Sequence, residues 1–136
     1  FVHVGCTGDK AICPSNYIPI GYEKDQNKLA EYYSLGDLFV FPSLLDTMPN
    51  ACLESLACGT PLLCFNISGM PYIANQTTAI FVEPRNIDQL CDVIKKTHKK
   101  TPEIISVCRK YAESRYDNKK YYDKLAEFGY LLGGKK

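Results

Sequence analysis

The sequence lacks several features that would define common classes of protein. No apolar run is long enough to cross a membrane, and no basic segment followed by an apolar one marks a signal peptide. There is no Cys-x2-Cys pair and the only histidines are His3 and His98, so no zinc site is expected. A complete G-x-G-x-x-G and an Asp-x-Asp are also absent. What remains is an ordinary globular composition, with 46% apolar and 23% charged residues.

The cysteines point to a reducing compartment. There are seven, an odd number, and most lie inside apolar segments. A disulfide framework is not expected in a chain of this size that can bury a core. We interpret the cysteines as reduced thiols that serve as small hydrophobic side chains in a cytoplasmic protein.

The length of 136 residues predicts one domain. The chain starts in an apolar segment with no initiator Met, which suggests a piece of a longer protein, so the domain is expected to be incomplete. We divide it into an α/β core over 1–100 and a basic helical tail over 101–136. Residues 1–94 carry four basic and ten acidic side chains, whereas residues 95–136 carry twelve and five. Because the tail lysines are interleaved with Tyr, Leu and Glu, a solvated helix face is favoured over a nucleic-acid site.

Apolar periodicity predicts alternating strands and helices. Strands are expected at 1–4, 16–20, 38–41, 62–65 and 79–82, with a tight Gly turn over 5–9. Helices are expected at 26–36, 49–58, 70–75, from a cap at Asn86 or Asp88 to 96, at 102–115 and at 119–132. This alternation is typical of a doubly wound, parallel α/β sheet of the Rossmann-like type.

The stretch from Asp37 to Pro61 carries the most chemistry. It predicts a strand, a loop and a helix that starts at about Pro49 without a good capping side chain. The amides of the next residues would then be free at the positive end of the helix dipole, which suits an anion; these are Asn50, Ala51 and Cys52. Asp46 in the loop and Glu54 in the helix could both edge a pocket at the carboxyl end of the strand.

The same stretch resembles the nucleotide-sugar site of glycosyltransferase family 4, retaining enzymes of the GT-B architecture. The resemblance rests on five elements in order and covers about residues 1–116. They are Ile18-Pro-Ile-Gly21-Tyr22, the run from Tyr33 to Ser43, Asp46 with Glu54-Ser-Leu-Ala-Cys-Gly59-Thr-Pro61, Ser68-Gly69-Met70-Pro71, and Ala79-Ile-Phe-Val82-Glu-Pro84.

The resemblance implies a role for each site residue. Glu54 would accept hydrogen bonds from the ribose hydroxyls, and Asp46, where the family usually has Glu, would contact the donor sugar or the reacting centre. The backbone at the helix start would bind the diphosphate, and Gly21 with Tyr22 would lie near the base. Three further donor contacts are implied at Ser43, Ser68 and Gly69.

By this resemblance the whole enzyme would be a hexosyl-type transferase of polysaccharide biosynthesis. It would move a sugar from a nucleoside diphosphate donor to a hydroxyl of a saccharide or lipid-linked acceptor, with retention, and would need no metal and no cofactor. The family's N-terminal acceptor domain, a first strand and its basic loop have no counterpart here, so the piece alone is expected to be inactive. The location would be cytoplasmic, with a peripheral contact at the inner membrane face left open, and no nucleic-acid partner is expected. Two alternatives stay open: a non-catalytic nucleotide-binding α/β module, and a fragment of a GT-B epimerase or phosphorylase.

Overall fold

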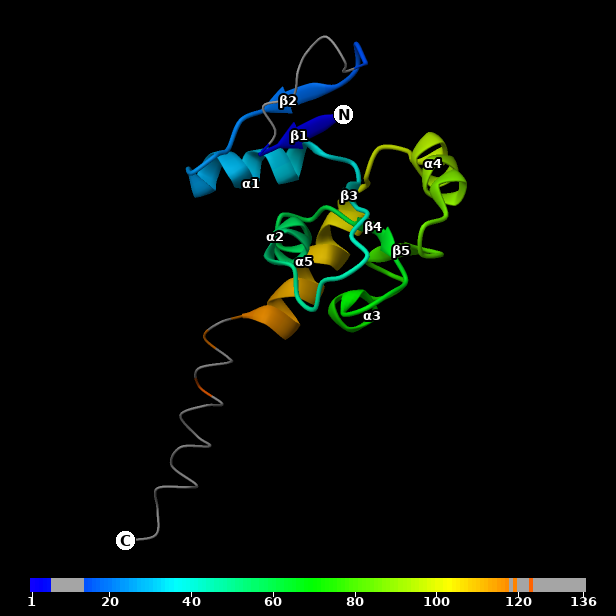
Figure 1. Cartoon of the computed structure of the whole chain (residues 1–136). Helices are drawn as coiled ribbons and strands as arrows, with labels where there is room; N and C mark the ends of the chain where they lie inside the picture. Colours follow the sequence, from blue (N-terminus) through cyan, green and yellow to red (C-terminus); the bar gives the residue numbers. More distant parts are fainter. Residues whose placement is uncertain (6–13, 118, 120–122, 124–136) are drawn as a thin grey trace, which may run out of the picture.

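The computed structural model describes residues 1–5, 14–117, 119 and 123. The turn predicted over 5–9 beyond Gly5, the helix predicted over 119–132, and Cys6 and Cys13 lie outside the described residues. The elements, labelled in Figure 1, are β1 (Val2–Val4), β2 (Ile18–Ile20), α1 (Gln26–Leu35), β3 (Phe39–Phe41), α2 (Asn50–Ala57), β4 (Leu62–Phe65), α3 (Met70–Ile73), β5 (Ala79–Val82), α4 (Ile87–Lys96) and α5 (Pro102–Tyr116).

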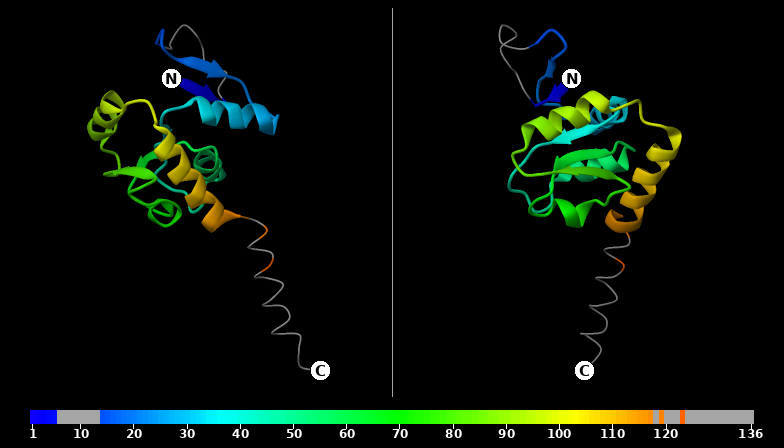
Figure 2. Two further views of the ribbon diagram at one scale, coloured as in Figure 1. Left: turned by 180° about the vertical axis from the view of Figure 1, so that it is seen from behind. Right: turned by 90° about the vertical axis from the view of Figure 1, so that its right-hand side faces the viewer.

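A three-stranded parallel sheet in the order β3-β4-β5 forms the centre of the molecule (Figures 1 and 2). Every residue of β4 is buried, because helices cover both faces of the sheet. Leu62 and Cys64 pack into a cluster with α2, α3 and α5, whereas Leu63 and Phe65 pack against α4. Side chains of a strand alternate between faces, so a run that is apolar at every position is what a doubly covered strand requires. The predicted Rossmann-like α/β class is thus confirmed.

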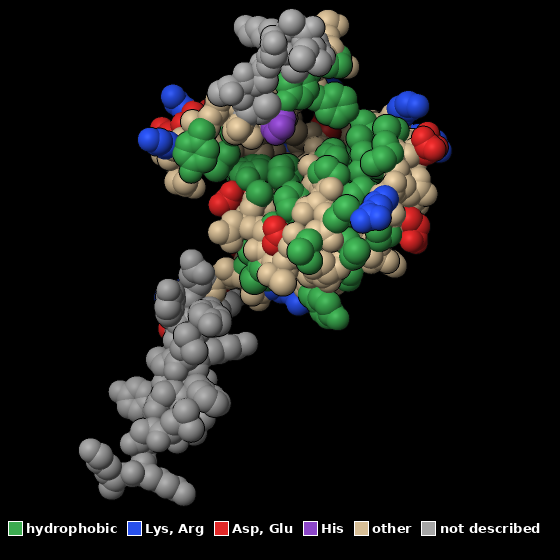
Figure 3. Space-filling view, in the orientation of Figure 1, with side chains coloured by type: hydrophobic (Ala, Val, Ile, Leu, Met, Phe, Trp, Pro, Cys, Tyr) green, Lys and Arg blue, Asp and Glu red, His purple; other side chains and the backbone are tan. Residues whose placement is uncertain are grey.

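The strands β1 and β2 form a second, separate sheet. They pair in parallel, with Val2 opposite Ile18, and no ladder joins them to β3-β4-β5 within the described residues. The apolar run at 1–4 predicts a buried strand. The strand is present, but the predicted burial is wrong, since Phe1 is 61% and Val2 53% exposed. Among the residues that the structure describes, β1 pairs with a strand along one edge alone. Hydrophobic side chains border a hollow below the β1-β2 unit (Figure 3).

The helix α2 is slightly shorter than predicted, and its buried face differs in part. The sequence predicts that Leu53, Leu56 and Ala57 share a face that packs on the sheet. In the structure Cys52, Ser55 and Leu56 are buried, but Ala57 is exposed. The reason is rotational: residues three and four apart share a face, and the face of Cys52 and Leu56 points to the sheet. Ala57 instead borders a groove between α2 and α5.

The helix α5 packs on α2 and completes one side of the core through Cys108 and Ala112. Gly59, which has a φ of +82°, lets the two helices approach closely, because a Cβ there would lie 2.6 Å from Cγ2 of Ile105. None of the described helices is long and apolar enough to cross a bilayer.

The start of α4 resolves the choice that the sequence left open. Asn86, not Asp88, is the cap, and its Oδ1 accepts a 3.0 Å hydrogen bond from the amide of Gln89. The spacing of Ile87, Leu90, Cys91 and Ile94 predicts that they share one face of this helix. Leu90 is buried, but Ile87 is 57% exposed. Ile87 is the first residue of the helix and is not part of the core cluster in which Leu90 packs against the sheet.

The loop between α4 and α5 is fastened to the end of α1 by Lys100. Its Nζ donates to the carbonyl of Ser34 and to Oγ1 of Thr60, both at 2.7 Å, and its amide donates to Oδ1 of Asp37 at 3.1 Å. Burial lowers the pKa of Lys100, although Asp37 acts in the opposite direction. This lysine therefore has a structural role at the amino-terminal end of the sheet.

Candidate functional site

Two loops meet at the carboxyl ends of β3 and β4. The loop after β3 carries Asp46, and the loop after β4 carries Ser68 and Gly69. The amide of Gly69 donates a 3.0 Å hydrogen bond to the carbonyl of Asp46. Because both strands are parallel neighbours, their following loops emerge at one edge of the sheet, where ligands bind in open α/β folds.

Gly69 makes this contact possible because it has no side chain. A Cβ at that position would lie only 1.8 Å from the carbonyl oxygen of Thr47. Ser68, just before it, has a φ of +57°, a left-handed conformation that is uncommon outside glycine. The structure thus brings Asp46, Ser68 and Gly69 together. It adds Thr47, whose backbone contact with Gly69 could not be predicted from the sequence.

The acidic loop is held by its own local bonds. Oδ1 of Asp46 accepts a 3.2 Å hydrogen bond from the amide of Met48. The hydroxyl of Ser43 donates to the carbonyl of Leu45 at 3.3 Å. Both side chains are partly exposed at the mouth of the sheet edge. The carboxylate of Asp46 is therefore oriented by its loop, and it keeps further acceptor sites for a ligand.

The amino end of α2 lies next to this loop and has no capping side chain. Pro49 is the N-cap residue, and Asn50 begins the helix. One part of the prediction is wrong: the amide of Cys52 is not free, since it donates to the carbonyl of Pro49 at 3.0 Å. A tight first turn uses this amide, which leaves Asn50 and Ala51 as the first helical residues whose amides find no carbonyl four residues earlier in the helix.

The Cys52 side chain is not a reactive group. It is fully buried, and burial raises the pKa of its thiol to about 12, with smaller contributions from Cys64 and from the nearby carboxylate of Asp46. A thiol with such a pKa stays protonated at neutral pH and is a poor nucleophile. The buried thiol and the bonded amide of Cys52 are thus both engaged within the protein, and a ligand contact of this residue stays a prediction.

Glu54 lies one turn inside α2, in contact with a different set of residues. Its Oε2 accepts a 3.0 Å hydrogen bond from the hydroxyl of Tyr33 on α1. It also lines a groove of about 340 Å³ between α2 and α5, together with Tyr116 and Asp117. Asp46 does not line this groove, so the prediction that both acids edge one pocket stays a prediction.

Helical spacing in the sequence predicts only that Tyr33 faces inward from the helix at 26–36. Burial raises its pKa first, and the hydrogen bond to Glu54 raises it further. A tyrosine at the edge of a core commonly finds a partner for its hydroxyl, and this rule was the available signal. It could not have identified Glu54 as the partner, because the two residues are 21 positions apart.

Gly21 and Tyr22 directly follow β2, which is a strand of the separate two-stranded sheet. Tyr22 is 80% exposed, and the carbonyl of Gly21 accepts a 3.3 Å hydrogen bond from the amide of Gly5. Among the described residues, the backbone hydrogen bond of Gly21 lies within the β1-β2 unit, and no hydrogen bond joins Gly21 or Tyr22 to the loops at Asp46 and Gly69.

No group of three or more His, Cys, Asp or Glu side chains is arranged to hold a metal ion in the part of the chain that the structure describes. The five described cysteines are free thiols. Metal independence itself stays a prediction.

An open α/β sheet whose loops converge at the carboxyl ends of parallel strands defines a broad class of ligand-binding proteins. Within this class, a family model described as glycosyl transferases group 1 matches residues 9–100. The chain belongs to that family.

Individual relatives agree with this assignment. The chain is 29% identical over 105 residues to an Escherichia coli enzyme named UDP-Gal:alpha-D-GlcNAc-diphosphoundecaprenol alpha-1,3-galactosyltransferase, which covers 75% of this chain and 27% of the relative. It is 29% identical over 70 residues to the D-inositol 3-phosphate glycosyltransferase of Mycobacteroides abscessus, with 51% and 16% covered. It is 27% identical over 71 residues to the O-antigen chain mannosyltransferase B of Escherichia coli, with 52% and 18% covered. The chain thus spans between 16% and 27% of the length of these relatives.

Proposed function

We propose that this chain is the donor-binding part of a glycosyltransferase that moves a hexosyl group from a nucleoside diphosphate sugar to an acceptor hydroxyl. The observation that carries the proposal is the contact between Gly69 and Asp46, next to the uncapped start of α2. It gathers an acidic loop, a glycine loop and a helix amino terminus at the edge of the sheet where a nucleotide sugar would lie. Two of the relatives are named as a mannosyltransferase and a galactosyltransferase. These names support a hexose as the sugar and an acceptor of polysaccharide biosynthesis.

Each residue has a role in this proposal. The amides of Asn50 and Ala51 receive the diphosphate, whose negative charge the helix dipole favours. Glu54 accepts the ribose hydroxyls, and Asp46 contacts the sugar. As the glycosidic bond breaks, charge grows on the diphosphate, so the helix amino terminus stabilises the leaving group in the transition state.

We propose retention of the anomeric configuration and a reaction that needs no metal. Both follow from the resemblance to the retaining family. They are tested on the whole enzyme by recording the anomeric proton of the product by NMR, and by measuring turnover in EDTA. Inversion, or loss of turnover in EDTA that Mg²⁺ restores, would contradict these points.

We further propose that the domain is completed by one more strand and a basic loop. The free edges of β1 and β3 support this, because each is a parallel strand with a ladder on one side alone among the described residues. A strand between them would make one continuous sheet, and a basic loop would supply the cations that a diphosphate needs. The isolated chain is then expected to bind donor weakly and not to turn over.

The test is an NMR titration of the labelled chain with UDP, GDP and ADP. One nucleotide is expected to shift amides at Asn50–Glu54 and around Gly69, and Glu54→Ala is expected to abolish the shifts. The matched control is Glu31→Ala, an exposed acid on α1. Asp46→Asn should leave nucleotide binding unchanged but remove the gain in affinity that an attached sugar brings.

If no nucleotide shifts these amides, the upstream segment is restored and the titration repeated. Shifts that appear only then would support the completed domain. Their absence from the longer, folded protein would overturn the donor-site proposal.

A further inference from the structure

A second cavity lies at the opposite end of the sheet from the donor loops. It has a volume of about 460 Å³ and opens at the amino-terminal ends of β4 and β5, beside Pro61 and Thr78. Apolar side chains form much of its wall: Leu38 just before β3, Ile80 on β5, Val93 on α4 and Ile104 on α5. We call it the basic groove, for the charges at its rim.

The rim of the basic groove is cationic. Lys96, His98, Lys99 and Lys100 line it, and Asp37 is the one acidic residue among the described residues that do. The carboxylate of Asp37 already accepts from the amide of Lys100, whose ammonium is bonded to Ser34 and Thr60. Lys96 and Lys99 are exposed. They are therefore the cations that the fold leaves for a ligand.

Part of this charge has a simpler explanation. Lys95 and Lys96 fall in the last turn of α4, where cations offset the negative end of the helix dipole. That explanation does not reach His98 and Lys99, which lie beyond the end of the helix. The segment 95–100 carries four lysines and a histidine with no acid.

Exposed apolar side chains accompany these cations. Ile80 lines the groove and is 45% exposed. Leu35 is 75% exposed and follows Ser34, whose carbonyl accepts the hydrogen bond from Lys100. A site for a small soluble anion gains nothing from exposed hydrophobic groups. Basic and apolar groups side by side are instead the combination that binds the interface of an anionic bilayer, where phosphates attract the cations and the acyl boundary takes the apolar groups.

We propose that the basic groove is a docking surface for a membrane that contains anionic phospholipid. Lys96 and Lys99 bind lipid phosphates, and Ile80 and Leu35 face the acyl boundary. The groove and the donor loops lie at opposite ends of the parallel strands. Nucleotide binding and membrane docking therefore do not compete, and the donor loops stay accessible when the groove is occupied.

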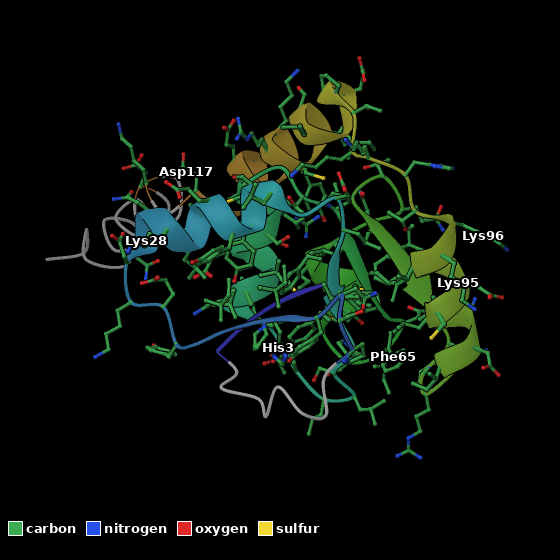
Figure 4. The ribbon with its side chains drawn as sticks, turned by 90° about the horizontal axis from the view of Figure 1, so that it is seen from above. His3, Lys28, Phe65, Lys95, Lys96 and Asp117 are labelled. Atoms are coloured by element: carbon green, nitrogen blue, oxygen red, sulfur yellow. The ribbon has the colours of Figure 1, made fainter. Side chains whose placement is uncertain are left out.

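The test is sedimentation of the chain with vesicles of phosphatidylcholine containing 30% phosphatidylglycerol, compared with pure phosphatidylcholine. Binding is expected only to the anionic vesicles and is expected to weaken with added salt. The double variant Lys96→Gln/Lys99→Gln should lower the partition coefficient about 30-fold, as expected for two lysines at an anionic surface. The matched control, Lys24→Gln/Lys28→Gln, removes the same charge from another part of the molecule. Figure 4 shows Lys28 far from Lys95 and Lys96. This control should change the partition coefficient much less.

Two results would overturn the proposal. One is an equal loss of vesicle binding in both double variants, because binding would then depend on the net charge of the protein and not on the position of the lysines. The other is a pair of results: inorganic phosphate at millimolar concentration abolishes vesicle binding, and Ile80→Ser does not change it. Together they would show that the groove binds soluble anions and not a membrane. Urea unfolding of each variant checks that the fold is kept. Because the nucleotide titration is separate, a failure here would leave the donor-site proposal standing.

Discussion

The hydroxyl of Tyr33 donates a 3.0 Å hydrogen bond to Oε2 of Glu54, and this bond joins α1 to α2. It fixes the Glu54 carboxylate from one side. A carboxylate has about four acceptor positions, so one bond of this kind orients the group without saturating it. Tyr33 is thus placed to position the acid that we assign to the ribose.

Replacing Tyr33 with Phe should weaken both the fold and the proposed site. The free energy of unfolding in urea is expected to fall by about 1 kcal/mol, the usual net worth of such a hydrogen bond. Nucleotide affinity should fall less than in Glu54→Ala, because the acid remains but loses its orientation. Tyr32→Phe, on the same helix and also partly buried, is the control. Equal effects of the two substitutions would contradict the positioning role.

Alkaline pH should destabilise the protein through its buried thiols. Burial raises the pKa values of Cys52 and Cys64 to about 12. In the unfolded chain these thiols lose their protons near pH 8.5, whereas the folded protein keeps them protonated. The unfolded state then binds fewer protons, so stability is complete below about pH 8.5 and declines from there to about pH 12.

This alkaline decline can be measured by urea unfolding at a series of pH values. Cys64→Ala should flatten the profile, although it also lowers stability at neutral pH by leaving a cavity. Val82→Ala, a buried change on β5 that removes no titratable group, should leave the shape of the profile unchanged. A profile of Cys64→Ala that is parallel to that of the unchanged protein would disprove the assignment.

Gly69→Ala should disrupt the meeting of the two loops. The new Cβ would lie 1.8 Å from a backbone oxygen, and backbone cannot move aside as a flexible side chain can. We expect a loss of about 1–3 kcal/mol in stability, as for overpacking elsewhere. Gly36→Ala is the control, since its Cβ would meet no atom closer than 3.7 Å. Similar thermal midpoints for the two variants would show that the loop contact tolerates a side chain.

Lys100→Met should remove the hydrogen bonds that hold the loop between α4 and α5 against the end of α1 and should lower the stability of the fold. Its ammonium makes two hydrogen bonds of 2.7 Å, and loss of a charged donor of this kind costs about 2 kcal/mol. The neighbouring Lys99→Met removes the same charge from an exposed side chain and should stay within about 0.5 kcal/mol. Chemical unfolding of both variants measures the difference, and a negligible cost for Lys100→Met would mean that the fastening is not needed.

Helices and strands with buried faces could be predicted from the sequence. Contacts between residues that lie far apart in the sequence could not. The buried run Leu62–Phe65 was predictable because every position is apolar, and the capping of α4 was narrowed to two residues. The exposure of Val2 was not predictable, because an apolar strand has the same sequence pattern whether or not a neighbour covers it. In the candidate site, Asp46 and Glu54 could be singled out by residue type, whereas the hydrogen bond from Tyr33 and the contact of Gly69 with Thr47 arise only on folding.

Three buried cysteines in the core of this domain can report local unfolding. Cys52, Cys64 and Cys108 are all fully buried, and they come from α2, β4 and α5. A thiol reagent can modify them only when the element that carries each one separates from the cluster. Their labelling rates, followed by mass spectrometry of the native protein, would therefore measure the free energies of local and global opening at three points without introducing any foreign probe.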